Sequence, residues 1–424
     1  MKSEISKARL RGVVTREKKA TAAAETRSFR NGNFLAVLYI AILATVAVVA
    51  MLWAYPRSLW STRLPSGIVI TFVALLGSRM MFGLIAPDVL RRNSRILMLC
   101  FVCIFSIILS ATCLVITTNP HIQDLFGFDL TKACPFLFPY LLAPALATLL
   151  VSPAAGISLG VGTMILNMLF VENASVLPAL AIGVVTSVIT TEVVGKVRKR
   201  TALLRAFVLA GGMQFLGVLI YLTMEMALGK DSESLAEATL VSAVSSIIST
   251  VFSFGFTVIL LPIFEHIFAA CSNIRLNEFS DLGSPLLQRL SLEAPGTYHH
   301  SIVVANLAAA AADRIGANAL LARVGSYYHD IGKLSKPSFY TENVGAGQQS
   351  PHQNISPNMS TVIIAAHVKE GIGISLHYNL PPPILDIIRE HHGTGIMSWF
   401  LHKAKEDAKA KAAKTKSDPQ PIDE

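Results

Sequence analysis

The chain carries little charge. Only 15% of its 424 residues are Asp, Glu, Lys or Arg, against roughly 25% in an ordinary soluble protein. The deficit falls on residues 34–264, which hold most of the apolar runs, whereas residues 1–33 and 272–424 carry most of the charge. This distribution argues against one large soluble globule and predicts a membrane part with soluble ends.

Cysteine is also scarce. The five cysteines all lie in or beside the apolar region: Cys100, Cys103, Cys113, Cys134 and Cys271. Cys100 and Cys103 form a CxxC without a second ligand pair nearby, which favours a packing or lipid-facing role over zinc. The net charge of +9 is explained by basic loops that orient a membrane protein, so we expect a lipid bilayer as partner and no nucleic-acid polymer.

Several segments are long and apolar enough to cross a bilayer, which takes roughly 20 residues. The eight candidates are 34–54, 67–86, 96–117, two short spans within 135–171 that Ser152-Pro153 separates, 176–195, 206–228 and 240–264. We therefore interpret 34–54 as a first transmembrane helix, 55–66 as a short extracytoplasmic loop and 67–264 as a seven-helix membrane domain.

Basic residues set the expected orientation. The first 30 residues contain nine Lys or Arg, which places the tail 1–33 in the cytoplasm. An even number of spans then returns the C-terminal part to the cytoplasm, and no secretory signal is expected. The sequence predicts a multi-pass protein of the cell inner (plasma) membrane. Charged residues near predicted span ends, such as Arg79, Glu192 and Glu225, leave a transporter open, but snorkelling explains them more simply.

The sequence of the soluble part shows no strand pattern, so it predicts an all-α domain. We expect a linker helix over 265–295, a domain over 296–403 and a charged linker or tail over 404–424. The expected helices of this domain are 298–315, 318–329, 358–378, 383–393 and 396–411.

Eight of the eleven histidines fall between residues 299 and 392. His352 and His377 are interpreted as core residues, which is the usual role of a lone histidine on an apolar helix face. The other candidates lie near predicted helix ends or turns, where different segments can meet: His300, His329 with Asp330, His367, and His391 with His392. Imidazoles with a carboxylate suit Mn, Fe, Zn or Ni, and a carboxylate can bridge two ions. Surface histidines without a metal are the alternative.

The motifs TYHHS at 297–301, HDIGK at 329–333, AAHVKEG at 365–371 and IIREHHG at 387–393 resemble those of the HD-domain phosphohydrolases. Their order is similar to that of the seven-transmembrane HD family of cyclic di-AMP phosphodiesterases. The resemblance implies a polytopic membrane bundle followed by a cytoplasmic HD-type domain. It also implies hydrolysis of a cyclic dinucleotide, with cyclic di-AMP as the favoured substrate and linear pApA as the product. The cofactors implied are two divalent metal ions, with Mn²⁺ or Fe²⁺ favoured.

Carried over by position, the resemblance implies that His300, His329 and Asp330 hold one metal. Asp330 would bridge to a second metal held by His367, His391 and His392. Lys333 is the candidate for neutralising a phosphate oxygen or assisting the leaving group, with a solvated lysine as the alternative. Gly332 is expected to form the turn that lets Lys333 face the phosphate.

Two departures from the family pattern leave alternatives open. The family adds an Asp from a later helix to the first metal site, and none of Asp407, Asp418 and Asp423 is a convincing match. The HD domain is therefore expected to be incomplete at its C-terminus, and a receptor that binds nucleotide or metal without hydrolysis is the alternative function. The large extracellular domain of the family is also reduced to about a dozen residues here.

The Gly393-Thr394 that follows the His pair argues against the HD-GYP hydrolases of cyclic di-GMP. The sequence leaves open whether the chain forms a homo-oligomer.

Overall fold

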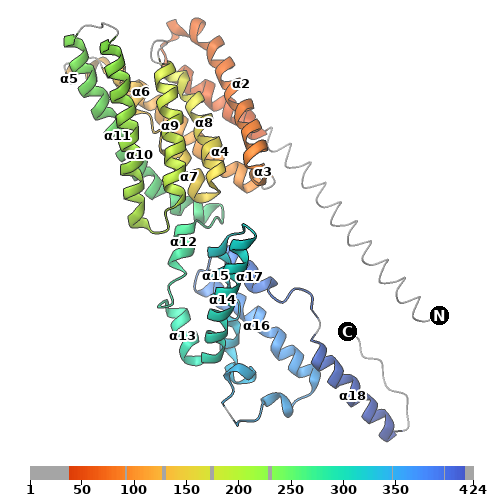
Figure 1. Cartoon of the computed structure of the whole chain (residues 1–424). Coiled ribbons are helices and arrows are strands. Elements are labelled where there is room, and N and C mark those ends of the chain that lie inside the picture. Colours follow the sequence, from red (N-terminus) through yellow and green to blue (C-terminus); the bar gives the residue numbers. More distant parts are fainter. Residues whose placement is uncertain are drawn as a thin grey trace. The chain divides into compact units, whose positions relative to one another are not determined.

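The computed structural model describes residues 38–90, 93–126, 130–171, 176–227, 232–345, 347–395 and 397–415. The predicted basic tail 1–33 lies outside these ranges. The chain divides into two compact units, Met1–Phe268 and Ala269–Glu424. Both are helical, and no strand occurs among the described residues, which agrees with the predicted all-α class (Figure 1).

The first unit begins with an apolar helix, Leu38–Ala54. Its remaining α-helices are α2 (Trp60–Ile85), α3 (Pro87–Leu90), α4 (Asn93–Thr117), α5 (Pro120–Phe126), α6 (Cys134–Leu137), α7 (Leu142–Leu150), α8 (Pro153–Asn167), α9 (Val176–Gly195), α10 (Arg200–Ala227) and α11 (Ser232–Ile267). Short 3₁₀ helices are η1 (Arg57–Leu59), η2 (Leu130–Ala133) and η3 (Met168–Phe170).

Helix α7 forms the centre of this unit. All nine of its residues are buried, as expected for a helix that is apolar on every side. The break after it lies at Ser152, as predicted, where the Ser152 hydroxyl accepts a hydrogen bond from the Ala155 amide at 3.2 Å and caps α8. Some hydroxyl side chains buried in the bundle donate to their own helix, as Thr148 does to the Pro144 carbonyl at 2.6 Å, and these hydroxyls add little cost in an apolar environment.

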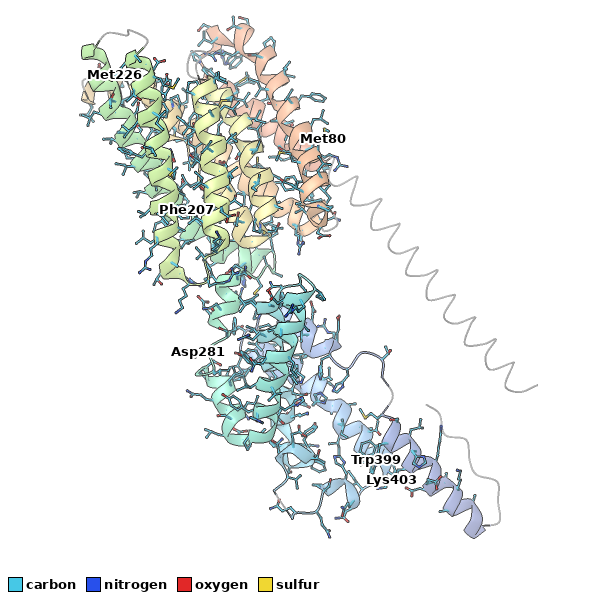
Figure 2. All side chains as sticks on the ribbon, in the orientation of Figure 1. Met80, Phe207, Met226, Asp281, Trp399 and Lys403 are labelled. Carbon is cyan, nitrogen blue, oxygen red and sulfur yellow. The ribbon has the colours of Figure 1, made fainter. Side chains whose placement is uncertain are left out.

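Seven helices of the described chain are long and apolar enough to span a membrane, and α16 (Pro357–His377), one of them, belongs to the second unit. The six in the first unit are joined by two shorter apolar segments, Leu38–Ala54 and Cys134–Leu150. Large apolar side chains face outward from this unit; Met80 is 60% exposed and Met226 54%, whereas Phe207 is buried (Figure 2). Such a surface suits lipid contact.

The prediction that residues 55–66 form a loop is wrong for most of this segment. Its polar residues are helical, since α2 begins at Trp60. Thr62 donates to the Leu59 carbonyl at 3.0 Å, and Arg63 donates to the Val171 carbonyl at 3.3 Å. These bonds satisfy polar groups that the sequence pattern had assigned to water.

The second unit contains α12 (Asn273–Glu278), α13 (Pro285–Glu293), α14 (Pro295–Arg314), α15 (Ala319–Tyr328), α16, α17 (Pro382–Glu390) and α18 (Ser398–Thr415). Between α15 and α16 lie the 3₁₀ helices η5 (Ile331–Ser335), η6 (Pro337–Phe339), η7 (Thr341–Asn343) and η8 (Pro351–Gln353). The five helices expected between 298 and 411 all occur, with ends shifted by a few residues.

Two expected elements of this region differ in the structure. The linker helix 265–295 is instead the end of α11 followed by α12 and α13, because Gly283 and Pro285 interrupt it; Leu276, Leu287 and Leu290 are buried in the core of the second unit. The tail expected over 404–424 is helical to Thr415. Its Ala, Lys and Glu residues are good helix formers, and Lys409 pairs with Glu406 at 3.1 Å. Residues 416–424 lie outside the described ranges.

Candidate metal centre

Four chain segments place the six predicted ligands. His300 lies in the second turn of α14, His329 and Asp330 lie where α15 passes into η5, and His391 and His392 follow the end of α17. His367 lies in the middle of α16, not near a helix end as expected. The structure brings all six together in two groups that share Asp330: one with His300 and His329, the other with His367, His391 and His392. Within each group the candidate ligand atoms lie within 4.8 Å of one another.

The two oxygens of Asp330 face different histidines. Oδ2 lies 3.1 Å from His329 Nε2 and 3.9 Å from His300 Nε2. Oδ1 lies 3.4 Å from His367 Nε2 and 3.6 Å from His391 Nε2. The buried carboxylate thus presents one oxygen to each histidine group.

Backbone carbonyls orient three of these rings in the same manner. The Nδ1 atoms of His329 and His391 donate to the carbonyls three residues earlier, of Ser326 at 2.8 Å and Ile388 at 2.9 Å, and His367 Nδ1 donates to Ile364. A carbonyl only accepts, so each Nδ1 carries the hydrogen and each Nε2 of a neutral ring presents a lone pair. Such bonds commonly orient metal-binding histidines.

The charge state of the site also suits a cation. Burial alone would raise the pKa of Asp330, but the neighbouring His329 and His391 side chains and the positive charge of Lys333 hold it well below its usual range. Burial lowers the pKa values of His367 and His392. At neutral pH the site therefore offers the Asp330 carboxylate and, at His367 and His392, neutral imidazoles, the form in which these residues bind metals.

Close backbone packing places His367 beside Asp330. A Cβ at Gly332 would lie 1.8 Å from the His367 carbonyl oxygen and 2.5 Å from the Gly371 nitrogen. Gly332 thus lets η5 approach the middle of α16. It is not the turn for Lys333 that the sequence suggested, since it lies within η5.

Lys333 is held by two carboxylates. Its Nζ lies 2.8 Å from Asp330 Oδ2 and 2.7 Å from Glu342 Oε1, with the Tyr340 ring centroid at 5.1 Å. Burial alone would lower the pKa of Lys333, but the two carboxylates raise it above its ordinary value. The amine is therefore a fixed cation at the edge of the Asp330 site.

The Glu342 side of the Lys333 site was not predicted from the sequence. Thr297 donates from its hydroxyl to Glu342 Oε1 at 3.1 Å and from its amide to Asn343 Oδ1 at 3.1 Å. Glu342 and Asn343 lie in the stretch 335–357, which its Pro, Gly and Ser content marked only as a break.

The remaining candidates lie outside the two groups. His352 is buried, with Nε2 2.8 Å from the Phe339 carbonyl, which agrees with its expected core role. The same expectation for His377 is wrong, because its side chain is exposed at the end of α16. His299 and Asp407 are exposed and belong to neither group.

Comparisons with known proteins place the chain in a family. The family described as "7TM receptor with intracellular HD hydrolase" matches residues 61–272, half of the chain. The chain belongs to this family. The HD domain family matches residues 297–420, which contain the whole histidine cluster. The HD domain is a metal-dependent hydrolase domain, and this one contains a His/Asp cluster that could bind metal.

Curated relatives of this 7TM-HD protein are longer than the matched part. The chain is 36% identical over 271 residues to the cyclic-di-AMP phosphodiesterase PgpH of Listeria monocytogenes, covering 64% of this chain and 37% of the relative. It is 44% identical over 167 residues to PgpH of Bacillus subtilis, covering 39% and 23% respectively. The solved HD domain of L. monocytogenes PgpH in complex with cyclic-di-AMP is 49% identical, covers 30% of this chain and 59% of that chain, and has a TM-score of 0.29. The matched region thus spans about a third or less of the curated relatives.

Proposed function

We propose that this 7TM-HD protein is a membrane-bound, metal-dependent phosphodiesterase that opens a cyclic dinucleotide. The supporting observation is that the two carboxylate oxygens of Asp330 face different histidines. One oxygen faces His300 and His329, and the other faces His367 and His391. Two hard or borderline cations suit this set of imidazole and carboxylate donors, and no thiol is among them.

Asp330 would be shared by both ions, with His300 and His329 holding one and His367, His391 and His392 the other. When bound, two divalent ions lower the pKa of a water and stabilise the charge that develops on a phosphodiester. Mn²⁺ or Fe²⁺ is the identity we favour.

Lys333 would bind the phosphate directly. Its ammonium has three donors, and two of them face Asp330 and Glu342. The third is available for a non-bridging phosphate oxygen or for the leaving oxygen. The ion pair with Glu342 would hold the amine in place while the substrate enters.

Cyclic di-AMP is the favoured substrate, with linear pApA as product. Two relatives carry the name cyclic-di-AMP phosphodiesterase. The HD domain would lie in the cytoplasm beneath the plasma membrane, because the basic loops of the sequence predict that side.

A receptor that binds the nucleotide without hydrolysing it is the second candidate. It is favoured by the first ligand group, which among the described residues has only His300, His329 and Asp330. The second group has four candidate ligands, one more than the first.

The test uses the purified full chain loaded with Mn²⁺ or, without oxygen, Fe²⁺. Cyclic di-AMP and cyclic di-GMP are supplied separately, linear products are followed by chromatography, and nucleotide binding is measured by calorimetry. We expect metal-dependent conversion of cyclic di-AMP that is lost in Asp330→Asn and kept in His377→Ala, which alters an exposed histidine of α16. Tight binding without turnover by the metal-loaded chain would establish the receptor instead.

A further inference from the structure

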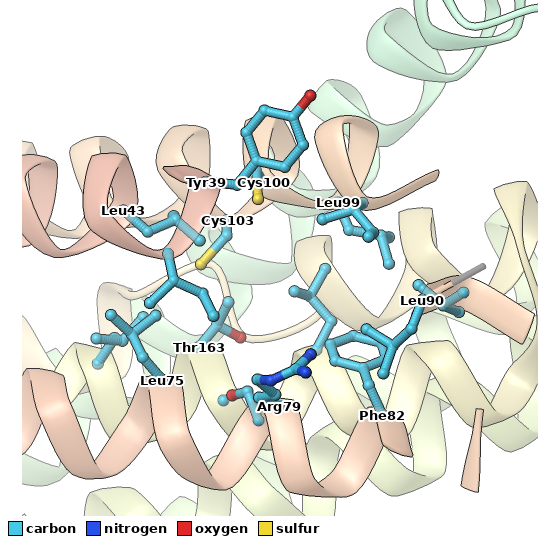
Figure 3. A pocket seen from close by; sticks show the side chains of 17 residues that line it. Tyr39, Leu43, Leu75, Arg79, Phe82, Leu90, Leu99, Cys100, Cys103 and Thr163 are labelled. Atoms are coloured by element: carbon cyan, nitrogen blue, oxygen red, sulfur yellow. The ribbon is translucent and has the colours of Figure 1, made fainter. Parts of the chain in front are cut away.

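An exposed arginine of the membrane unit, Arg79, borders an apolar cavity. In Figure 3 the Arg79 guanidinium lies between the side chains of Thr163 and Phe82. The cavity has a volume of about 80 Å³ and lies between the Leu38–Ala54 helix, α2, α4 and α8. Arg79 is the one charged residue in its lining.

No partner of Arg79 occurs in the described part of the chain. Acids of the same unit have other partners: Glu192 pairs with Lys196 at 2.5 Å, and Asp88 and Glu225 have contacts of their own. A guanidinium without a counter-ion at the edge of the hydrocarbon is costly, and it also recognises phosphate groups well through two parallel hydrogen bonds.

A second, longer cavity begins at the same arginine. It has a volume of about 380 Å³ and runs along the seam between the Leu38–Ala54 helix and α2. Its walls are almost entirely apolar, with Ala44 and Val48 on one side and Ile68 and Phe72 on the other. From Ile68 to Arg79, α2 rises about 16 Å, roughly the hydrocarbon depth of one leaflet.

We propose that this seam binds a phospholipid with an anionic headgroup. The acyl chain lies between the Leu38–Ala54 helix and α2, and the headgroup phosphate contacts the Arg79 guanidinium. An apolar groove that ends in one unpaired cation has the polarity of such a lipid. Arg79 lies six residues before the end of α2 at Ile85, at a depth where a lipid phosphate and a long side chain can meet.

Snorkelling toward water is the competing explanation. It requires no groove and gives no preference among headgroups, since bulk water would satisfy the guanidinium. The proposal instead predicts selectivity that depends on both Arg79 and the shape of the seam. These two dependences can be tested separately.

The experiment uses the full chain in nanodiscs that contain phosphatidylglycerol and phosphatidylcholine in equal amounts. The lipids that remain bound after transfer to mild detergent are counted by native mass spectrometry. We expect wild type to retain the anionic lipid about tenfold more than the zwitterionic one, the ratio typical of one charge-assisted contact. Arg79→Gln should abolish this preference, and Arg205→Gln, which alters an exposed arginine of α10 outside the cavity, should keep it.

A second pair of variants tests the acyl-chain part of the site. Ala44→Trp fills the seam and leaves Arg79 in place, so both lipids should be lost together. Val49→Trp adds the same side chain at a 57% exposed position on the same helix and should behave as wild type. Size-exclusion profiles check that each variant is folded.

Three outcomes would overturn the proposal. Equal retention of the two lipids by wild type would leave snorkelling as the explanation, and an unchanged preference in Arg79→Gln would place the selectivity elsewhere. Displacement of the anionic lipid by millimolar inorganic phosphate, with no effect of Ala44→Trp, would identify a free-phosphate site.

Discussion

The Nε2 atoms of His367 and His391 lie 3.2 Å apart. Both rings donate from Nδ1 to a carbonyl of their own chain segment, so in neutral rings both Nε2 atoms present lone pairs to each other. His392 Nε2 lies 3.1 Å from the same His367 atom. Lone pairs at this separation repel unless a proton or a cation lies among them, and the proposed second ion is such a cation.

This arrangement predicts how metal binding depends on pH. Burial lowers the pKa values of His367 and His392 below the ordinary 6.5, so their neutral, metal-binding form persists to lower pH than in an exposed histidine. Mn²⁺ affinity should be nearly constant from about pH 8 to about pH 6.5 and should fall toward pH 5. Titration with free Mn²⁺ followed by electron paramagnetic resonance measures this, with His377→Ala as the control. A fall that begins well above the ordinary histidine pKa would contradict it.

Asp330→Asn should weaken both metal positions together. Asparagine keeps the shape and removes the negative charge that the two positions share, so we expect at least a 100-fold loss of affinity, which is about the upper end for residues that only support a metal ligand. Elemental analysis after dialysis against a buffered metal concentration measures occupancy. His391→Ala alters one group only, so it should empty one position and leave His300 and His329 able to hold the other. Equal loss in the two variants would show that the sites are not independent.

Much of this site could be predicted from sequence, because several ligands are neighbours in the chain and lie at predicted helix ends. His329 and Asp330 are adjacent, His391 and His392 are adjacent, and helix boundaries set by Gly and Pro placed them at segment ends. The approach of η5 to the middle of α16 could not be predicted, since it depends on two backbones in contact at Gly332 and Gly371. The place of His367 therefore became clear only from tertiary packing.

The segment after Lys333 was unpredictable for another reason. Residues 335–357 have no periodic pattern, and their order comes from side-chain bonds such as those of Glu342 and Asn343 with Thr297. These partners are separated by about 45 residues in sequence. Local propensity carries no information on contacts at that distance.

The Lys333–Glu342 pair should stabilise the second unit in a pH-dependent manner. Burial alone would raise the pKa of Glu342, but the ion pair with Lys333 and the Thr297 hydroxyl hold it below its ordinary value of 4.5. A lowered carboxyl pKa contributes stability that is present above the unfolded-state pKa and is lost as pH falls through the folded-state value.

In metal-free protein, Glu342→Gln should therefore reduce the free energy of unfolding by about 1 kcal/mol at neutral pH, because the pair is partly exposed. The difference from wild type should shrink as pH falls below about 4. Urea unfolding followed by circular dichroism at several pH values measures it. Glu293→Gln, which removes an exposed ion pair with Arg289, is the control and should have a smaller effect. A difference that persists in acid would assign the loss to packing.

Gly332→Ala tests whether backbone contact builds the metal site. The added Cβ would lie 1.8 Å from the His367 carbonyl oxygen, far closer than atoms can pack, so η5 must move away from α16. Because Asp330 precedes η5 and His367 lies on α16, this movement separates the carboxylate from the second histidine group. We expect a 10- to 100-fold loss of metal affinity, roughly that seen when support for a ligand is lost, and a loss of about 1–3 kcal/mol of stability from overpacking.

Gly373→Ala provides the matched control on α16. Nothing lies within 4 Å of a Cβ at Gly373, and alanine in a helix is favoured over glycine by about 0.5–1 kcal/mol. This variant should bind metal as wild type does and unfold at the same or a higher urea concentration. If Gly332→Ala kept wild-type metal affinity while losing stability, Asp330 would have to be positioned by its histidine partners alone. The contact between η5 and α16 would then serve the fold and not the site.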